Sequence, residues 1–119
     1  MKDSKHKALC QQYFETWNQN NVNLLAGLFA MDINLTDWEI SADGLFDVMA
    51  ANQKIFDSVA TIRAEVSEMI QDDENPHRVV CTLTVFVDEG TSNPTILSVV
   101  DIIQFNDAGK ISSIRAYKG

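Results

Sequence analysis

One stretch, Thr95 to Phe105, constrains the fold of this chain more than any other. Side chains alternate between two faces along a β-strand, so every second residue shares a face. One face of this stretch is apolar except for a single carboxylate, and it carries Thr95, Leu97, Val99, Asp101, Ile103 and Phe105. An isolated charge on a buried face is too costly, so Asp101 must be paired, hydrogen-bonded or kept protonated. The first question is therefore what Asp101 faces.

The N-terminal half has the hydrophobic period of helices. A first helix is expected to run to about Gln19, capped by Asp3 or Ser4, with an apolar stripe of Leu9, Cys10, Tyr13, Phe14 and Trp17. A short second helix is expected over residues 22–29. A third should follow the turn Ser41–Gly44 and end near Asp57, with an inward stripe of Leu45, Phe46, Val48, Met49, Asn52, Ile55 and Phe56.

From Ala60 onward the period changes to two, which is typical of strands. Breaks rich in turn-forming residues at 71–76, 88–94 and 106–109 divide this half into four strands joined by hairpins. A shorter alternating stretch near residues 31–38 places Ile33, Leu35 and Asp37 on one face. The pattern predicts a single α+β domain over residues 1–119, in which three helices pack on one face of a curved, mainly antiparallel sheet and enclose an apolar pocket.

Composition narrows the possible partners of the chain. The 119 residues carry a net charge of −8, which argues against nucleic acid or an anionic membrane as a partner. The spacing of Cys10 and Cys81 suggests neither a disulfide framework nor a metal site, and it leaves a disulfide between them open. No signal peptide or membrane-spanning segment is recognisable, so a cytoplasmic protein is expected.

The order of elements, and the ending that runs from Val100 to Ile111 and continues with Arg115-Ala116-Tyr117, resembles the nuclear transport factor 2-like (NTF2-like) superfamily, which includes SnoaL-like proteins. Within that superfamily, three positions match the ketosteroid isomerases: Tyr13 on the first helix, Asp37 after Leu28-Phe29-Ala30, and Asp101. The resemblance implies an NTF2-like cone and an isomerase that needs no cofactor. In such an enzyme Asp37 is the base, and Tyr13 and protonated Asp101 form the oxyanion hole.

The chain also departs from the ketosteroid isomerases. Trp38 follows the expected base where those enzymes usually have proline, and Phe29 and Asn52 replace two supporting tyrosines. Lys118 replaces an aromatic residue of the pocket wall. These departures leave the proton-transfer residues in place and argue against a steroid-shaped substrate. The residues expected to contact a small hydrophobic carbonyl compound are Trp17, Phe29, Trp38, Phe46, Met49, Leu97, Val99 and Ile114.

The residues themselves support the same chemistry. Moving a proton beside a carbonyl group needs a base near the carbon and hydrogen-bond donors at the oxygen. Each residue also has a structural interpretation: Asp101 satisfied by Tyr13 or the backbone, Asp37 in solvent at the sheet rim, and Tyr13 packed in the core. His6, near the expected frayed end, and His77, in a turn, are expected to be exposed, and neither is expected to act as a base.

Two alternative functions stay open at this point. The same acid–base groups would suit a SnoaL-like polyketide cyclase, and the pocket could instead serve a non-catalytic ligand-binding or dimerisation module. No metal site is expected. Val100 and Ile102 lie on the face opposite Asp101, so a homodimer formed through the outer face of the sheet is expected. Gel filtration would test that pairing.

Overall fold

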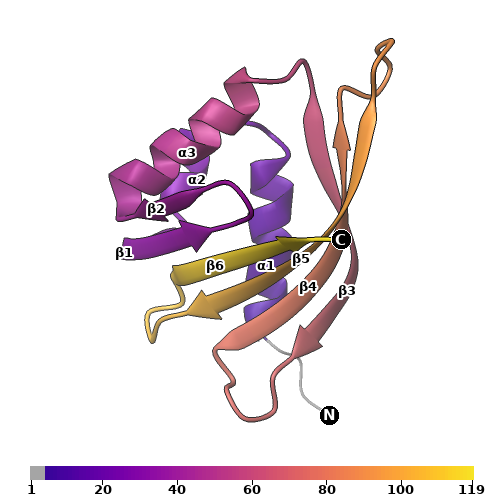
Figure 1. Cartoon of the computed structure of the whole chain (residues 1–119). Coiled ribbons are helices and arrows are strands. Elements are labelled where there is room, and N and C mark those ends of the chain that lie inside the picture. Colours follow the sequence, from indigo (N-terminus) through magenta and orange to yellow (C-terminus); the bar gives the residue numbers. More distant parts are fainter. Residues whose placement is uncertain (1–4) are drawn as a thin grey trace.

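The computed structural model describes residues 5–119, which form three helices and one six-stranded sheet (Figure 1). The helices are α1 (Lys5–Trp17), α2 (Val22–Ala26) and α3 (Leu45–Asp57). The strands are β1 (Phe29–Thr36), β2 (Ser41–Asp43), β3 (Ile62–Gln71), β4 (Arg78–Val87), β5 (Thr95–Phe105) and β6 (Ile111–Lys118). Their order in the sheet is β2-β1-β6-β5-β4-β3, and only the β1–β6 pair is parallel. This arrangement confirms the predicted NTF2-like α+β fold.

The three helices lie on the same side of the curved sheet (Figure 1). Helix α1 packs against β3 and β4, α3 packs against β1 and β2, and α2 contacts both of these helices. The end of α1 is tied to the sheet by Asn18, whose side-chain amide accepts from the backbone nitrogen of Ala64 (2.7 Å) and donates to its oxygen (2.9 Å). Helix α1 is therefore held at a fixed height above the concave face.

The N-terminal elements correct two of the predicted boundaries. Helix α1 ends at Trp17 and not near Gln19, because Asn18 is engaged by β3. Helix α2 ends at Ala26, since Phe29 already begins β1 and pairs with Ile111. The caps proposed at Asp3 and Ser4 lie outside the described residues.

The segment Ser41–Asp43, predicted as a turn, is instead the edge strand β2, which pairs antiparallel with Asn34–Thr36 of β1. Three residues are too few to show a period of two, so the sequence pattern could not distinguish this strand from a loop. Gly44 follows with a φ of 90°, a conformation that favours glycine, and the chain turns there into α3.

The alternation of β5 is confirmed. Val99, Asp101, Ile103 and Phe105 are buried on the concave face, whereas Ile96 on the convex face is 66% exposed. Val100 and Ile102 are half-buried on the convex face. Pairing of two copies of the chain through that face stays a prediction.

His6 was predicted to lie in a frayed end, and the structure shows that this is wrong. Its ring is buried in α1 against Phe105 and His77, with ring centroids 4.9 Å and 5.2 Å apart. Burial and the neighbouring His77 lower the pKa of His6. His77 is half-exposed in the β3–β4 connection, with its Nε2 atom 3.3 Å from the Asp107 carboxylate. Both rings lie outside the cavity described below.

Candidate active site

The register of the sheet places two carboxyl groups in one row across the concave face. Asp101 of β5 pairs with Ala116 of β6 on one side and with Cys81 of β4 on the other. On β1, Thr36 pairs with Arg115, so Asp37 lies level with Ala116. Adjacent strands are about 4.8 Å apart, which separates the Cα atoms of Asp37 and Asp101 by roughly 10 Å. The small side chain of Ala116 lies between them.

A cavity of about 290 Å³ lies above this row, between the sheet and helices α1 and α3. Tyr13, Asp37 and Asp101 all contribute to its wall. Most of the remaining lining is apolar. Among the residues predicted to contact a substrate, those that line the cavity are Trp17, Trp38, Leu97, Val99 and Ile114.

Three predicted contact residues lie elsewhere. Phe29 is buried beside Tyr13, with ring centroids 6.1 Å apart, and does not reach the cavity. Met49 is half-buried on α3 and also misses the cavity wall. Phe46 was expected to face inward but is 75% exposed. It precedes the buried Val48 by two residues, about 200° around a helix, so the two side chains cannot share a face.

Asp101 occupies a buried position in the cavity wall. Its side chain is only 7% exposed and finds no hydrogen-bond partner within residues 5–119. Within residues 5–119, every side-chain oxygen or nitrogen that is inaccessible to solvent has a hydrogen-bond partner. The Asp101 oxygens have none, so they must be accessible, and they are accessible from the cavity. Burial, followed by the negative charge of Asp37, raises the pKa of Asp101 to about 7. The carboxyl group can therefore hold a proton near neutral pH and donate it in a hydrogen bond.

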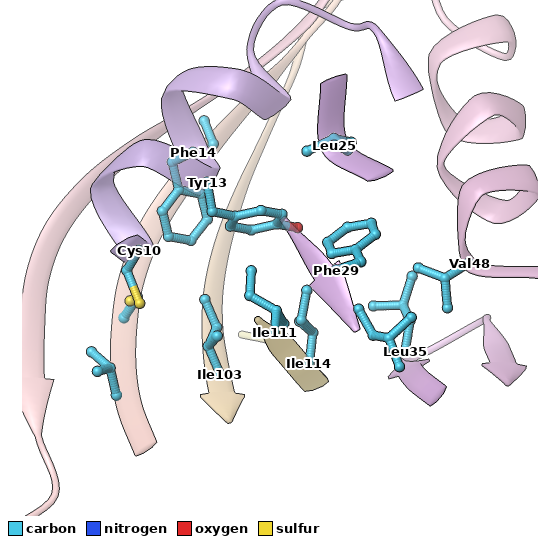
Figure 2. Close-up of a cluster of buried hydrophobic side chains, with 14 of the residues drawn as sticks. Cys10, Tyr13, Phe14, Leu25, Phe29, Leu35, Val48, Ile103, Ile111 and Ile114 are labelled. Carbon is cyan, nitrogen blue, oxygen red and sulfur yellow. The ribbon is translucent and has the colours of Figure 1, made fainter. Parts of the chain in front are cut away.

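Tyr13 reaches the same cavity from α1. Figure 2 shows its ring projecting from the helix, with the hydroxyl oxygen beside Phe29. Burial, and then the neighbouring Asp101, raise the pKa of Tyr13 well above its ordinary value, so the group stays a neutral phenol. Its hydroxyl has no hydrogen-bond partner within the described residues and is free to donate to a bound molecule.

Asp37 lies in a different environment, on the connection between β1 and β2. Its Oδ1 atom accepts from the backbone nitrogens of Glu39 (2.7 Å) and Ile40 (2.6 Å), which fixes the side chain at the edge of the cavity. Its Oδ2 atom accepts no hydrogen bond from residues 5–119. Trp38 follows, 41% exposed, with the Lys118 ammonium 5.4 Å from its ring centroid. One oxygen of Asp37 thus holds the β1–β2 connection, and the other is available to accept from a bound molecule.

Asn52 is a polar residue of the cavity wall that the sequence argument did not assign to the site. It is 3% exposed, and its Oδ1 atom accepts from the indole nitrogen of Trp17 at 3.0 Å. Its Nδ2 atom donates to the backbone oxygen of Val48, also at 3.0 Å. The sequence contained a signal for this position, because an asparagine on the apolar stripe of a helix must find hydrogen-bond partners in the interior.

Cys81 pairs with Asp101 on the far side of the row, and Cys10 of α1 is labelled in Figure 2. Both thiols are free and fully buried, so the disulfide that the sequence left open is not formed. Their mutual hydrogen bond and burial raise the pKa of Cys10 above its usual range. Such thiols are unreactive and act here as small apolar side chains.

Within residues 5–119, no group of three or more His, Cys, Asp or Glu side chains could hold a metal ion. None of the helices in this range has the length and apolarity needed to cross a bilayer.

The helix order, the curved mixed sheet and the cavity between sheet and helices define a protein of the NTF2-like class. The family profile of the SnoaL-like domain matches residues 10–114, and the chain belongs to that family. No curated protein sequence matches the chain.

Solved structures show the same fold at low sequence identity. A candidate SnoaL-like polyketide cyclase from Shewanella denitrificans is 12% identical, with a TM-score of 0.82 over 98% of this chain and 92% of that one. A candidate isomerase of the SnoaL-like family from Agrobacterium tumefaciens is 13% identical, with a TM-score of 0.79 over 98% and 99% of the two chains. SalBIII, an epoxide hydrolase/cyclase-like enzyme in pyran ring formation in the polyether salinomycin, is 17% identical, with a TM-score of 0.78 over 97% and 91%.

Proposed function

We propose that this protein is a proton-transfer enzyme that uses no cofactor and isomerises a small hydrophobic carbonyl compound through a dienolate, as ketosteroid isomerases do. One observation carries the proposal: Asp101 and Asp37 both contribute to one largely apolar cavity, Asp101 with a pKa raised to about 7 and Asp37 held by backbone amides, while the third carboxyl group of the wall, Glu39, is exposed. When two carboxyl groups of one site lie in contrasting environments, one can serve as the acid and the other as the base.

Asp37 acts as the base in this proposal. Its Oδ2 atom takes a proton from the carbon between the carbonyl group and the double bond of a β,γ-unsaturated ketone. The same oxygen returns the proton to the γ-carbon, which leaves the conjugated α,β-unsaturated product. The two backbone hydrogen bonds to Oδ1 keep the carboxylate oriented during both transfers. A positioned base of this kind contributes about 10²- to 10⁴-fold to the rate.

Tyr13 and Asp101 stabilise the charge that develops on the carbonyl oxygen. Both are buried, both reach the cavity, and neither has a partner within residues 5–119 that would compete with a substrate. A tyrosine and a protonated aspartic acid form the known oxyanion hole of ketosteroid isomerases, so these roles are transferred from that resemblance. Removing one such donor typically lowers kcat by about 10²- to 10³-fold.

The surrounding wall favours a flat apolar substrate. Ala116 lies between the two aspartates, and Leu97, Val99 and Ile114 provide an aliphatic floor. Trp17 and Trp38 add aromatic surfaces. The cavity volume of about 290 Å³ is near the lower limit of small-molecule sites, which favours one or two fused rings over a steroid.

A polyketide cyclase is the second candidate, supported by the similarity of the fold to a candidate SnoaL-like cyclase and to SalBIII. In that reaction the enolate formed by Asp37 attacks a second carbonyl carbon of the same molecule, and a ring closes as the π bond of that carbonyl breaks. The resulting alkoxide takes up the proton held by Asp37. Enolisation is common to both candidates, so they differ in the substrate and not in the first step.

The experiment follows the conversion of cyclohex-3-enone to its conjugated isomer by ultraviolet absorbance. Asp37→Asn is expected to lower kcat by about 10²- to 10⁴-fold, because the amide cannot accept the proton. Asp32→Asn, at an exposed aspartate of β1, the strand that precedes Asp37, is the matched control and should keep wild-type turnover. If the wild-type protein does not exceed the buffer rate, isomerisation of this ketone is excluded, and the cyclase and ligand-binding alternatives lead.

A further inference from the structure

The side-chain amide of Asn52 retains unused hydrogen-bonding capacity at the cavity wall. The Trp17 indole nitrogen can only donate, so the atom that accepts from it must be the amide oxygen of Asn52. The amide nitrogen of Asn52 then carries two hydrogens, one of which is donated to the Val48 oxygen. The other has no partner within residues 5–119. A buried donor without a partner costs free energy, and here the cavity is where it can find one.

The Asn52 amide is held firmly enough to select a ligand. The two hydrogen bonds fix its orientation, and Phe56 packs against the edge of the Trp17 ring, with centroids 5.3 Å apart. Side chains held in this way lose little entropy when a ligand binds. The cavity therefore contains a rigid hydrogen-bond donor in addition to Tyr13 and Asp101.

This donor belongs to a different element from the two proposed oxyanion donors. Trp17, the partner of Asn52, follows Tyr13 by four residues on α1. Asn52 itself belongs to α3, whereas Asp101 lies on β5, and all of these residues contribute to the cavity wall. The cavity thus receives hydrogen-bond donors from both helices and from the sheet.

We infer that Asn52 is a substrate-binding residue, and that the natural substrate carries a second oxygen acceptor, besides the oxygen of its enolisable carbonyl group, that accepts from the Asn52 amide. This inference rests on the proposed function, because Tyr13 and Asp101 must hold the carbonyl oxygen for the second oxygen to face Asn52. The ligand class is a fused-ring ketone with an ether, carbonyl or hydroxyl oxygen on its other ring.

The experiment compares two nearly isosteric ligands, 6-methoxy-2-tetralone and 6-ethyl-2-tetralone, by calorimetric titration, together with their 7-substituted isomers. The wild-type protein is expected to bind one of the methoxy isomers about five- to tenfold more tightly than its ethyl counterpart, as one hydrogen bond allows. In Asn52→Leu the ratio of the two dissociation constants should fall to about one. Gln53→Leu, which removes an exposed amide next to it on α3, is the matched control and should keep the wild-type ratio.

A wild-type protein that does not distinguish methoxy from ethyl overturns the inference, as does an unchanged ratio in folded Asn52→Leu. The absence of a wild-type preference overturns the inference even if the variant does not fold. Exchange of the tetralone C1 protons with deuterated solvent, followed by NMR, tests the proposed function separately. Exchange without a methoxy preference overturns the role of Asn52 alone. A methoxy preference that Asn52→Leu abolishes, without exchange in the wild type, supports Asn52 and overturns proton transfer.

Discussion

The middle of β5 and the connection after β1 place the same side chain in two contrasting environments. Asp101 on β5 is 7% exposed, has no hydrogen-bond partner within residues 5–119, and has its pKa raised to about 7 by burial and by Asp37. Asp37 is half-buried at the cavity edge, and two backbone nitrogens donate to one of its oxygens. Hydrogen bonds from backbone N–H groups favour the charged form of a carboxyl group, whereas burial away from water favours its neutral form.

In the proposed mechanism, this difference separates an acid from a base within one cavity. The charge on Asp37 contributes to it, because it opposes ionisation of Asp101. Ala116, which pairs with Asp101, belongs to the strand between the two aspartates, and two strand spacings are about 10 Å.

The strongest test compares donor replacements with loss of the base. Asp101→Leu and Tyr13→Phe each remove a donor and are expected to lower kcat for ketone isomerisation by about 10²- to 10³-fold. Asp101→Asn keeps an N–H group in place, so its loss should be smaller. The wild-type rate should also fall as the pH rises through about 7, where Asp101 loses its proton, and this decline should be absent in Asp101→Asn. If Asp101→Asn is as inactive as Asp37→Asn, the two carboxyl groups do not differ in role.

A second test measures the stability cost of burying Asp101. Its pKa is raised in the folded protein, so between pH 4 and 7 the unfolded chain has lost a proton that the folded protein still holds. The wild-type free energy of unfolding should therefore fall as the pH rises through this range, by up to about 4 kcal/mol for this group.

Asp101→Asn removes the titrating group. Urea unfolding should show its stability advantage over the wild type widening from pH 4 to pH 7 and then staying constant. An advantage that is the same at pH 4 and pH 8 would contradict the raised pKa.

The smallest effect concerns the structural oxygen of Asp37. Asp37→Ala leaves the backbone nitrogens of Glu39 and Ile40 without their acceptor and should lower the free energy of unfolding by about 1 kcal/mol. Asp37→Asn keeps an oxygen at that position and should stay close to the wild type in stability, although it is inactive. Equal stability losses in the two variants would show that the side chain does not hold the connection.

Much of the fold follows from local patterns in the sequence. The bounds of β5 and α3 were predicted correctly because a long uninterrupted period, bounded by turn formers or helix breakers, is a strong signal. The short strand β2 and the parallel pairing of β1 with β6 were not predicted. Neither leaves a local signal, since three residues show no period and pairing between distant segments depends on tertiary packing.

The candidate site divides in the same way. The sequence identified Tyr13, Asp37 and Asp101, and the structure brings all three to one cavity, while their catalytic roles stay a prediction. Phe46 and Met49 were misplaced because an amphipathic stripe does not state which of its flanking residues turns toward the interior. The sequence places Asn52 on that stripe, but it does not show that the Trp17 indole on α1 is its hydrogen-bond partner.

The sequence by itself determined that Asp101 shares a buried face with Val99 and Ile103, because alternation is a property of the strand backbone alone. Only the tertiary structure decided what Asp101 faces. The parallel pairing of β1 with β6 places Asp37 two strands away, and the packing of α1 brings Tyr13 above the same row. A pKa depends on the charges and the solvent around a group in three dimensions. The sequence could therefore show that Asp101 needs an explanation, but only the fold shows which groups surround it.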